Sequence, residues 1–203
     1  MESRYENSKI KDIVDDLEKR FKDSVLPKLS NITDETKRYA FFIAWLCTEL
    51  EYLGIGKIIV TGGFAVELYT GRTYRTMDVD LITENKLTSQ VVEEFLSRFS
   101  ERIGRGYLPL VTALSIKSID IVATTYVGNR KPVKLLVNSY ALYLVPPEDL
   151  IVIYLNGWKY WSSTEDRDKA LWLYVIWYER LSLIHISEPT RPLYISYAVF
   201  CLK

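Results

Sequence analysis

Apolar residues recur at helical spacing near the start of the chain, at Ile10, Ile13, Val14, Leu17 and Phe21. This period predicts an amphipathic helix that ends near Pro27, because proline cannot donate the hydrogen bond that a continuing helix needs. Thr33 or Asp34 can cap a second helix, which should run to about Leu53 and stop at Gly54. The second helix is apolar around much of its circumference from residue 40 to residue 47, so we expect it to be buried.

Short apolar runs bounded by turn residues predict a set of strands after these two helices. The runs cover residues 57–61, 78–83, 108–114, 118–124, 133–136 and 140–145. A helix from Phe64 separates the first two strands, and Thr88 or Ser89 can cap a helix after the second. The apolar face of that later helix consists of Val91, Val92, Phe95, Leu96 and Phe99.

The order of these elements predicts a strand-rich core between two helical parts. The N-terminal helices cover residues 1–56, the core covers 57–145, and the C-terminal helices cover 146–180. Pro146 and Pro147 begin the last part, with one helix to about residue 156 and another from Ser163 or Thr164. The expected fold class is α/β (α+β), with a short mixed sheet flanked by N-terminal and C-terminal helices.

The last segment, residues 181–203, reads LSLIHISEPTRPLYISYAVFCLK and resembles the in-frame translation of a sequencing adapter. We therefore treat it as a non-native tail and exclude it from the fold prediction. The exclusion removes His185 and Cys201, which leaves no histidine and the single cysteine Cys47. Cys47 lies in an apolar helical run and is expected to be a buried thiol. The interpretation also implies a natural chain that continues past Arg180.

The composition is that of a globular protein and points to no particular partner. Hydrophobic residues make up 48% of the chain and charged residues 26%. The 26 Lys and Arg residues balance 26 Asp and Glu residues, so net charge does not indicate a nucleic-acid or membrane surface. The apolar runs are too short to cross a bilayer. Without a secretory signal or a disulfide framework, we expect a cytoplasmic protein.

The strongest chemical signal is the stretch IIVTGGFAVELYTGRTYRTMDVDLI, residues 58–82. Gly62 and Gly63 follow a strand and let the backbone approach a phosphate closely, at the positive end of the next helix. Asp78 and Asp80 are two residues apart on an apolar strand, so both carboxylates point to one face. Adjacent carboxylates repel each other unless a cation lies between them, and Mg2+ is the natural occupant.

The pattern Gly-Gly, helix, Arg-Thr-x-Asp-Val-Asp resembles the signature of the nucleotidyltransferase-fold superfamily. It is most similar to small prokaryotic members related to AbiEii-type and minimal nucleotidyltransferases of toxin–antitoxin systems. The resemblance covers residues 57 to about 180 and is strongest from Val60 to Leu81. It implies a third carboxylate on a later strand, and Asp120 in Ser-Ile-Asp-Ile-Val occupies that position. Gly63 stands where many relatives carry serine, so phosphate binding would depend on backbone N–H groups.

The resemblance implies transfer of a nucleoside monophosphate from an NTP to a hydroxyl group, with two Mg2+ ions. The implied catalytic and metal-binding residues are Asp78, Asp80 and Asp120, with Asp120 as general base. The implied phosphate-binding residues are Gly62, Gly63, Arg75 and Thr76. The acceptor is unknown and can be a protein, an RNA such as tRNA, or a small molecule. A partner toxin or antitoxin protein is also implied.

Other interpretations of the same residues remain open. Asp78 and Asp80 can be water-exposed residues of an edge strand, and Asp120 can be structural. Arg75 can be a solvated loop residue, and Thr76 can satisfy local backbone groups. At the level of function, the alternatives are a catalytically weak or inactive binding module, such as an antitoxin-like partner, and a toxin that modifies tRNA. Trp158, Trp161, Trp172 and Trp177 suit a core or a partner surface.

Overall fold

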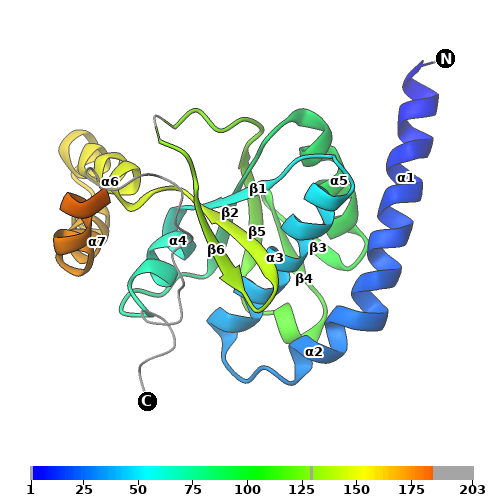
Figure 1. Ribbon diagram of the computed structural model, residues 1–203, viewed down its shortest axis with the longest axis horizontal. Coiled ribbons are helices and arrows are strands. Elements are labelled where there is room, and N and C mark those ends of the chain that lie inside the picture. The colour runs from blue at the N-terminus through cyan, green and yellow to red at the C-terminus, as the bar shows by residue number, and fades with distance from the viewer. Residues whose placement is uncertain (1, 129, 185–203) are drawn as a thin grey trace.

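One mixed sheet of seven strands forms the centre of the computed structural model, which describes residues 2–128 and 130–184 (Figure 1). The strand order is β3-β4-β5-β2-β1-β7-β6. β1 is antiparallel to β2 and parallel to β7, and β2 is parallel to β5. The strands are β1 (Ile58–Thr61), β2 (Asp78–Thr83), β3 (Ser100–Ile103), β4 (Gly106–Pro109), β5 (Ser118–Ala123), β6 (Val133–Val137) and β7 (Tyr140–Leu144). The predicted mixed sheet with flanking helices is confirmed.

The helices lie around this sheet and extend the molecule at both ends. They are α1 (Glu2–Arg20), α2 (Leu26–Ser30), α3 (Glu35–Tyr52), α4 (Gly62–Tyr69), α5 (Lys86–Ser97), α6 (Pro147–Trp161) and α7 (Thr164–Ile184). A π-helical turn (Phe21–Val25) joins α1 to α2. Figure 1 shows α1 at one end of the long axis and the α6–α7 hairpin at the other. His185 and Cys201 of the excluded tail lie outside the described residues.

Helix α3 is the central core helix, as its apolar circumference predicts. Its residues from Tyr39 to Cys47 are all buried. The Asp34 side chain caps it by accepting a hydrogen bond from the backbone N–H of Lys37 at 3.0 Å. Burial raises the pKa of Cys47 to about 12, so this thiol is a core group and not a nucleophile.

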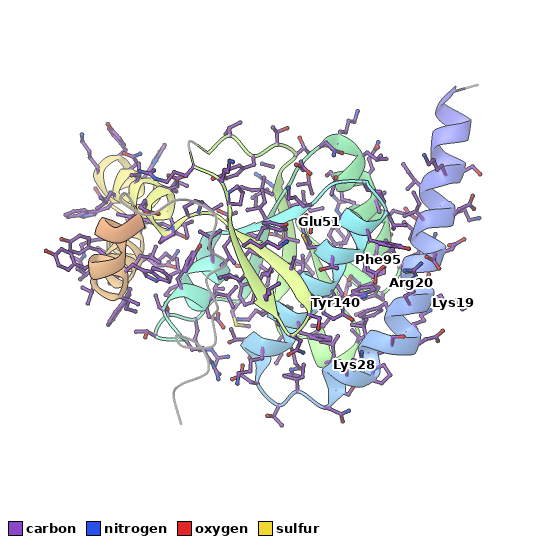
Figure 2. All side chains as sticks on the ribbon, in the orientation of Figure 1. Lys19, Arg20, Lys28, Glu51, Phe95 and Tyr140 are labelled. Carbon is purple, nitrogen blue, oxygen red and sulfur yellow. The ribbon has the colours of Figure 1, made fainter. Side chains whose placement is uncertain are left out.

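Aromatic side chains connect α3 to the elements beside it. Phe42 stacks on Phe95 of α5 with ring centroids 6.4 Å apart, and Tyr39 contacts Phe64 of α4 at 6.3 Å. On another side of α3, the Phe41 ring contacts the Tyr140 ring of β7, with centroids 5.5 Å apart. Figure 2 labels Phe95 and Tyr140. These contacts place α3 between α4 and α5 and against the sheet.

Two predicted boundaries are wrong for a local reason. The first α-helix ends at Arg20 and not near Pro27. The π-helical turn follows it, and α2 begins at Leu26, one residue before Pro27. Proline is tolerated there, since the first N–H groups of a helix have no internal partner. Helix α5 is capped by Asn85, whose side chain accepts from Thr88 N–H at 2.9 Å, and not by Thr88 or Ser89.

The predicted strand over residues 108–114 is also wrong. The chain forms the hairpin β3–β4 earlier, with Gly104 at φ +60° in the turn, and then a short 3-10 helix (Thr112–Leu114). Pro109 ends β4 because it has no N–H for the ladder. The apolar run after it packs as a turn, with Leu114 fully buried.

The α6–α7 hairpin carries an unusual amount of exposed apolar surface. Trp161 is 83% exposed, and side chains point outward from both helices in Figure 2. The exposed set comprises Val152, Ile153, Leu155, Trp158, Tyr160, Trp161, Leu171, Trp172, Tyr174, Val175, Ile176 and Tyr178. Trp177 faces inward instead: it is 5% exposed, and its indole N–H donates to the Tyr69 carbonyl of α4 at 3.2 Å. Over the described ranges, no helix has the length and apolar character that a membrane crossing requires.

Candidate active site

The double-glycine turn lies directly against one of the predicted carboxylates. Gly62 has φ +62°, a conformation that favours glycine, and a Cβ at this position would lie 1.8 Å from Asp80 Oδ2. The backbone N–H of Gly63 hydrogen-bonds Asp80, which favours the ionised carboxylate. Helix α4 begins at Gly62, two residues before the predicted Phe64, so both glycines belong to its first turn.

Replacing Gly62 by alanine should therefore destabilise the protein through two separate effects. Gly54 provides the matched control, because its φ is +66° and no atom lies within 4 Å of a Cβ there. We expect Gly54→Ala to cost about 1–2 kcal/mol from backbone strain alone. Gly62→Ala should cost about 1–3 kcal/mol more, because Asp80 must move. Urea unfolding of both variants measures the difference, and equal losses would contradict the close contact.

Strand pairing brings the three predicted aspartates to one face of the sheet. Asp80 of β2 lies opposite Asp120 of β5, and Asp78 lies opposite Ser118. The alternate residues of β2, including Val79 and Leu81, are buried on the other face. Ser118 Oγ donates to Asp78 Oδ1 at 2.6 Å. The carboxylates therefore form a cluster on neighbouring parallel strands.

The electrostatics of this cluster show negative charge that nearby cations and N–H groups only partly offset. Burial, followed by repulsion from Asp120 and Asp78, raises the pKa of Asp80 to about 6. Burial and the charge of Asp78 also raise the pKa of Asp120. Within the described chain, Asp120 Oδ1 is buried and has no hydrogen-bond partner. Gly106 leaves room for this oxygen, since a Cβ there would lie 1.7 Å from it.

These properties fit a divalent cation that binds together with a substrate. No three His, Cys, Asp or Glu side chains in the described ranges converge into a ready-made metal site. Mg2+ commonly takes only one or two carboxylates and completes its shell with water and substrate phosphates. Asp80 and the unpartnered Oδ1 of Asp120 offer hard oxygen ligands of that kind. The residues present therefore fit the predicted metal.

Without metal, burial and then this repulsion should make Asp80 a destabilising residue at neutral pH. The pKa of Asp80 is higher in the folded protein than its usual 3.8, so folding favours its protonated form. Its effect on stability therefore improves as the pH falls from above 6 towards 4. We expect Asp80→Asn to raise the free energy of unfolding at pH 7.5 in EDTA by about 1–2 kcal/mol, discounted for solvent screening.

The measurement is urea unfolding of both proteins between pH 5 and pH 8. Asp168→Asn is the control, because Asp168 lies in an exposed ion pair with Arg167 and should change stability little. The gain from Asp80→Asn should shrink as the pH falls below 6. A variant that is less stable than the wild type at pH 7.5 would show that Asp80 is not under repulsion.

The other predicted phosphate-binding residues lie in the loop before β2. Arg75 pairs with Glu35 at the start of α3, with Nη2 and Oε2 2.9 Å apart. The Thr76 N–H donates to Glu67 at 3.1 Å, and its hydroxyl accepts from the Asp78 N–H at 3.3 Å. Thr76 thus adjoins the carboxylates, while the Arg75 guanidinium is turned towards α3.

A buried charge network behind this loop was missed in the sequence. Lys117 and Glu67 are both fully buried, with Nζ and Oε2 3.1 Å apart. Lys117 Nζ also lies 2.9 Å from Glu35 Oε1 and donates to the Thr76 carbonyl. Thr36 donates its hydroxyl to Glu67 at 2.5 Å. The available signal was a charged residue inside each of two largely apolar segments, Glu67 in residues 64–69 and Lys117 in residues 113–122, since buried charges must be paired.

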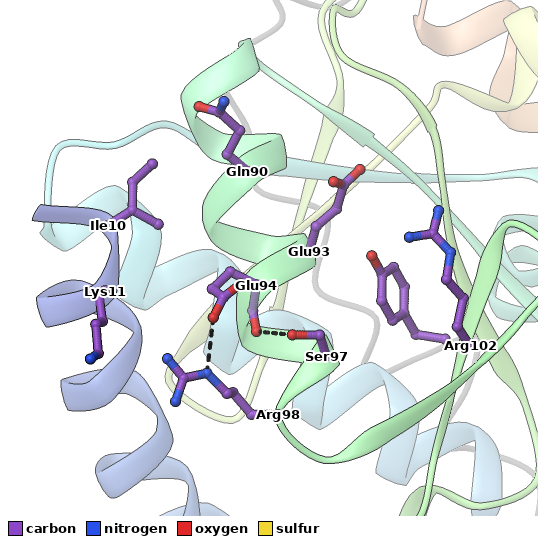
Figure 3. Close-up of a pocket in the computed structure, with 9 residues that line it drawn as sticks. Ile10, Lys11, Gln90, Glu93, Glu94, Ser97, Arg98 and Arg102 are labelled. Carbon is purple, nitrogen blue, oxygen red and sulfur yellow. Dashed lines mark hydrogen bonds and ion pairs between the residues drawn. The ribbon is translucent and has the colours of Figure 1, made fainter. Parts of the chain in front are cut away.

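A hollow elsewhere on the surface is separate from this cluster. It has a volume of about 610 Å³ and lies between α1, α5 and the β3–β4 hairpin. Figure 3 shows Arg98 paired with Glu94 in its wall. Arg102 lies over the Tyr107 ring at 5.5 Å. None of the described residues that line it is one of the three aspartates, so the carboxylate cluster remains the chemical centre.

The chain matches no protein-family model and no curated protein at the sequence level. The crystal structure of an antigenic nucleotidyltransferase-like protein from Paracoccidioides brasiliensis is similar, with a TM-score of 0.52 and 19% identity over 71% of this chain and 77% of that one. The crystal structure of ANT(2'')-Ia in complex with adenylyl-2''-tobramycin gives a TM-score of 0.45, with 12% identity over 72% and 94%. A TM-score below 0.5 adds nothing to the fold assignment. The first comparison shows that the chain has a nucleotidyltransferase-like fold.

Proposed function

We propose that this protein transfers a nucleoside monophosphate from an NTP to a hydroxyl acceptor. The observation that carries the proposal is the pairing of Asp80 and Asp120 on neighbouring strands, against the Gly62–Gly63 turn at the start of α4. That arrangement combines oxygen ligands for a metal with a backbone turn suited to phosphate. The nucleotidyltransferase-like fold supports the same reaction class.

Each site residue has a distinct role in the proposed reaction. Asp120 takes the proton of the acceptor hydroxyl as the general base. The acceptor oxygen then bonds to the α-phosphorus, and pyrophosphate leaves. Mg2+ held by Asp78, Asp80 and Asp120 would supply positive charge at the triphosphate. Gly62 and Gly63 would hold phosphate oxygens through the α4 N-terminus, with Thr76 beside them. Arg75 would have to leave Glu35 to contact the same phosphates.

Pyrophosphate release tests the reaction directly. Each NTP is incubated with the protein, Mg2+ and one of three acceptor fractions from a bacterial extract: proteins, RNA or small molecules. We expect pyrophosphate to form with one fraction and to require Asp78 and Asp80, as judged with the paired asparagine variants. Release that persists in those variants would overturn the assignment of the site. The active fraction would identify the acceptor and test a role in a toxin–antitoxin system.

A second candidate is a binding module with little or no turnover, such as an antitoxin-like partner of another protein. The exposed apolar residues of α6 and α7 favour it, because contiguous apolar surface of this kind marks protein contacts. Trp161 and Trp172 are exposed, as residues of a partner surface would be. Under this alternative, Mg2+ and NTP would bind without transfer, and Trp161→Ser with Trp172→Ser would weaken the protein complex. Transfer activity in the isolated protein would argue against it.

A further inference from the structure

A lysine from the C-terminal hairpin lies in a largely buried position next to the candidate site. The side chain of Lys169 on α7 is 13% exposed. Its Nζ lies 2.9 Å from Glu165 Oε1 and 3.6 Å from Asp166 Oδ1, both in the first turn of the same helix. Burial disfavours the charged form, but the hydrogen bond with Glu165 and the interactions with Tyr74 together outweigh it, so the pKa of Lys169 is raised. The ammonium group therefore stays charged.

Two tyrosine rings enclose this ammonium group from separate segments. Lys169 Nζ lies 5.3 Å from the centroid of Tyr74 and 5.2 Å from that of Tyr154. Tyr74 comes from the loop before β2 and donates its hydroxyl to Glu165 at 2.9 Å. Tyr154 comes from α6. Cation–π attraction to both rings holds the charge at a defined place.

The cluster borders the glycine turn and Asp80. The Tyr74 ring packs against Gly63, where an added Cβ would lie 3.3 Å from Tyr74 Cε1. The positive charge of Lys169 opposes the rise in the pKa of Asp80. Burial, and then neighbouring charges that include Asp80, raise the pKa of Tyr154. Tyr74 thus connects the ammonium group to the glycine turn at the α4 N-terminus, and the charge of Lys169 acts on Asp80.

A buried hydroxyl in the cluster lacks a partner. Tyr154 is only 7% exposed, yet within the described chain its hydroxyl forms no hydrogen bond. A buried unsatisfied hydroxyl costs about 1–3 kcal/mol, so a native structure keeps one only where something such as a catalytic role, a water or a bound ion accounts for it. The position offers a donor beside an ammonium group, which is the chemistry that recognises a phosphate oxygen.

We propose that Lys169 and the Tyr154 hydroxyl bind the β- and γ-phosphates of the donor nucleotide. The ammonium group exchanges Glu165 for a phosphate oxygen, and Tyr154 donates its hydroxyl hydrogen to the same group. The α6–α7 hairpin then supplies one wall of the nucleotide site, opposite the glycine turn. This subsite rests on the proposed function. It adds a phosphate contact from the C-terminal part of the chain to the nucleotide site.

The test is binding of the four Mg2+–NTPs, Mg2+–pyrophosphate and the four NMPs, followed by tryptophan fluorescence. Lys169→Met should weaken NTP and pyrophosphate binding about 10- to 100-fold, because a charged hydrogen bond is lost. NMP binding should change less than about threefold, because an NMP lacks these phosphates. Lys169→Arg should keep most of the affinity. Tyr154→Phe should weaken NTP binding several-fold without lowering the melting temperature, since it removes only an unpartnered hydroxyl.

Lys159→Met is the matched control. Lys159 lies on the same hairpin, over the Tyr160 ring at 5.1 Å, and its removal should leave all affinities unchanged. Unchanged NTP and pyrophosphate binding in Lys169→Met, equal weakening of NMP and NTP, or no binding of any of these ligands by the wild type would each overturn the subsite. Lys169-dependent binding in a wild type that transfers nothing would overturn the proposed function and leave the subsite standing.

Discussion

Replacing Asp120 by asparagine should lower kcat for nucleotidyl transfer about 10²- to 10⁴-fold, the usual contribution of a positioned general base. The amide keeps the size of the side chain but cannot take the proton of the acceptor hydroxyl. It also offers a weaker ligand in place of the buried, unpartnered Oδ1. The effect should fall on kcat more than on NTP affinity, because the α4 turn that would bind phosphate is untouched.

Ser118→Ala is the matched control for this variant. It lies on the same strand and removes only the hydrogen bond to Asp78. We expect it to lower kcat less than tenfold, because the carboxylate it contacts remains in place. Initial rates at saturating NTP and acceptor give kcat for both variants and the wild type. If Asp120→Asn kept activity within tenfold of the wild type, Asp120 would not be the base.

Replacing Lys117 by methionine should cost about 3–5 kcal/mol of stability, the largest structural effect that we expect. Lys117 is fully buried between Glu67 and Glu35, and its loss leaves the buried carboxylate of Glu67 without its cation. Breaking a buried pair from one side costs this much because the remaining charge is uncompensated. The loop that carries Thr76 should loosen as well, since Lys117 donates to its carbonyl.

Urea unfolding measures this loss of stability. Two further variants test whether the buried charge pair causes it. Lys57→Met removes a more exposed lysine that lies 3.7 Å from Glu84, so it should cost no more than about 1 kcal/mol. The double variant Lys117→Met with Glu67→Gln should recover part of the loss, because no unpaired charge remains. Equal losses for Lys117→Met and Lys57→Met would contradict a role for the buried network.

Where local signals were strong, the sequence predicted the structure well. The burial of α3 followed from its continuous apolar surface, and the Asp34 cap from its position before the helix. Placing Asp78 and Asp80 on one face required only the two-residue period of a strand. The pairing of Asp80 with Asp120 depended on strand order and register, which a local pattern does not contain.

The features that the sequence did not predict lack a local pattern of apolar and polar residues. The β3–β4 hairpin contains Gly104 and Gly106 among polar and charged residues, so its strands lack the apolar alternation that marks a buried strand. The contacts of Lys117 with Glu67, and of Lys169 with Tyr74, join residues far apart in the chain. Such contacts arise only when the fold brings distant segments together, so composition and spacing do not identify which residues pair.

The most direct test of the central claim compares α-labelled and γ-labelled NTPs with the wild-type protein, Mg2+ and an acceptor fraction. A nucleotidyl transfer should place the α-label on the acceptor and release the γ-label as pyrophosphate, and Asp80→Asn should abolish both. No transfer of α-label from any NTP, by protein that still binds Mg2+ and nucleotide, would contradict the account and favour a binding module.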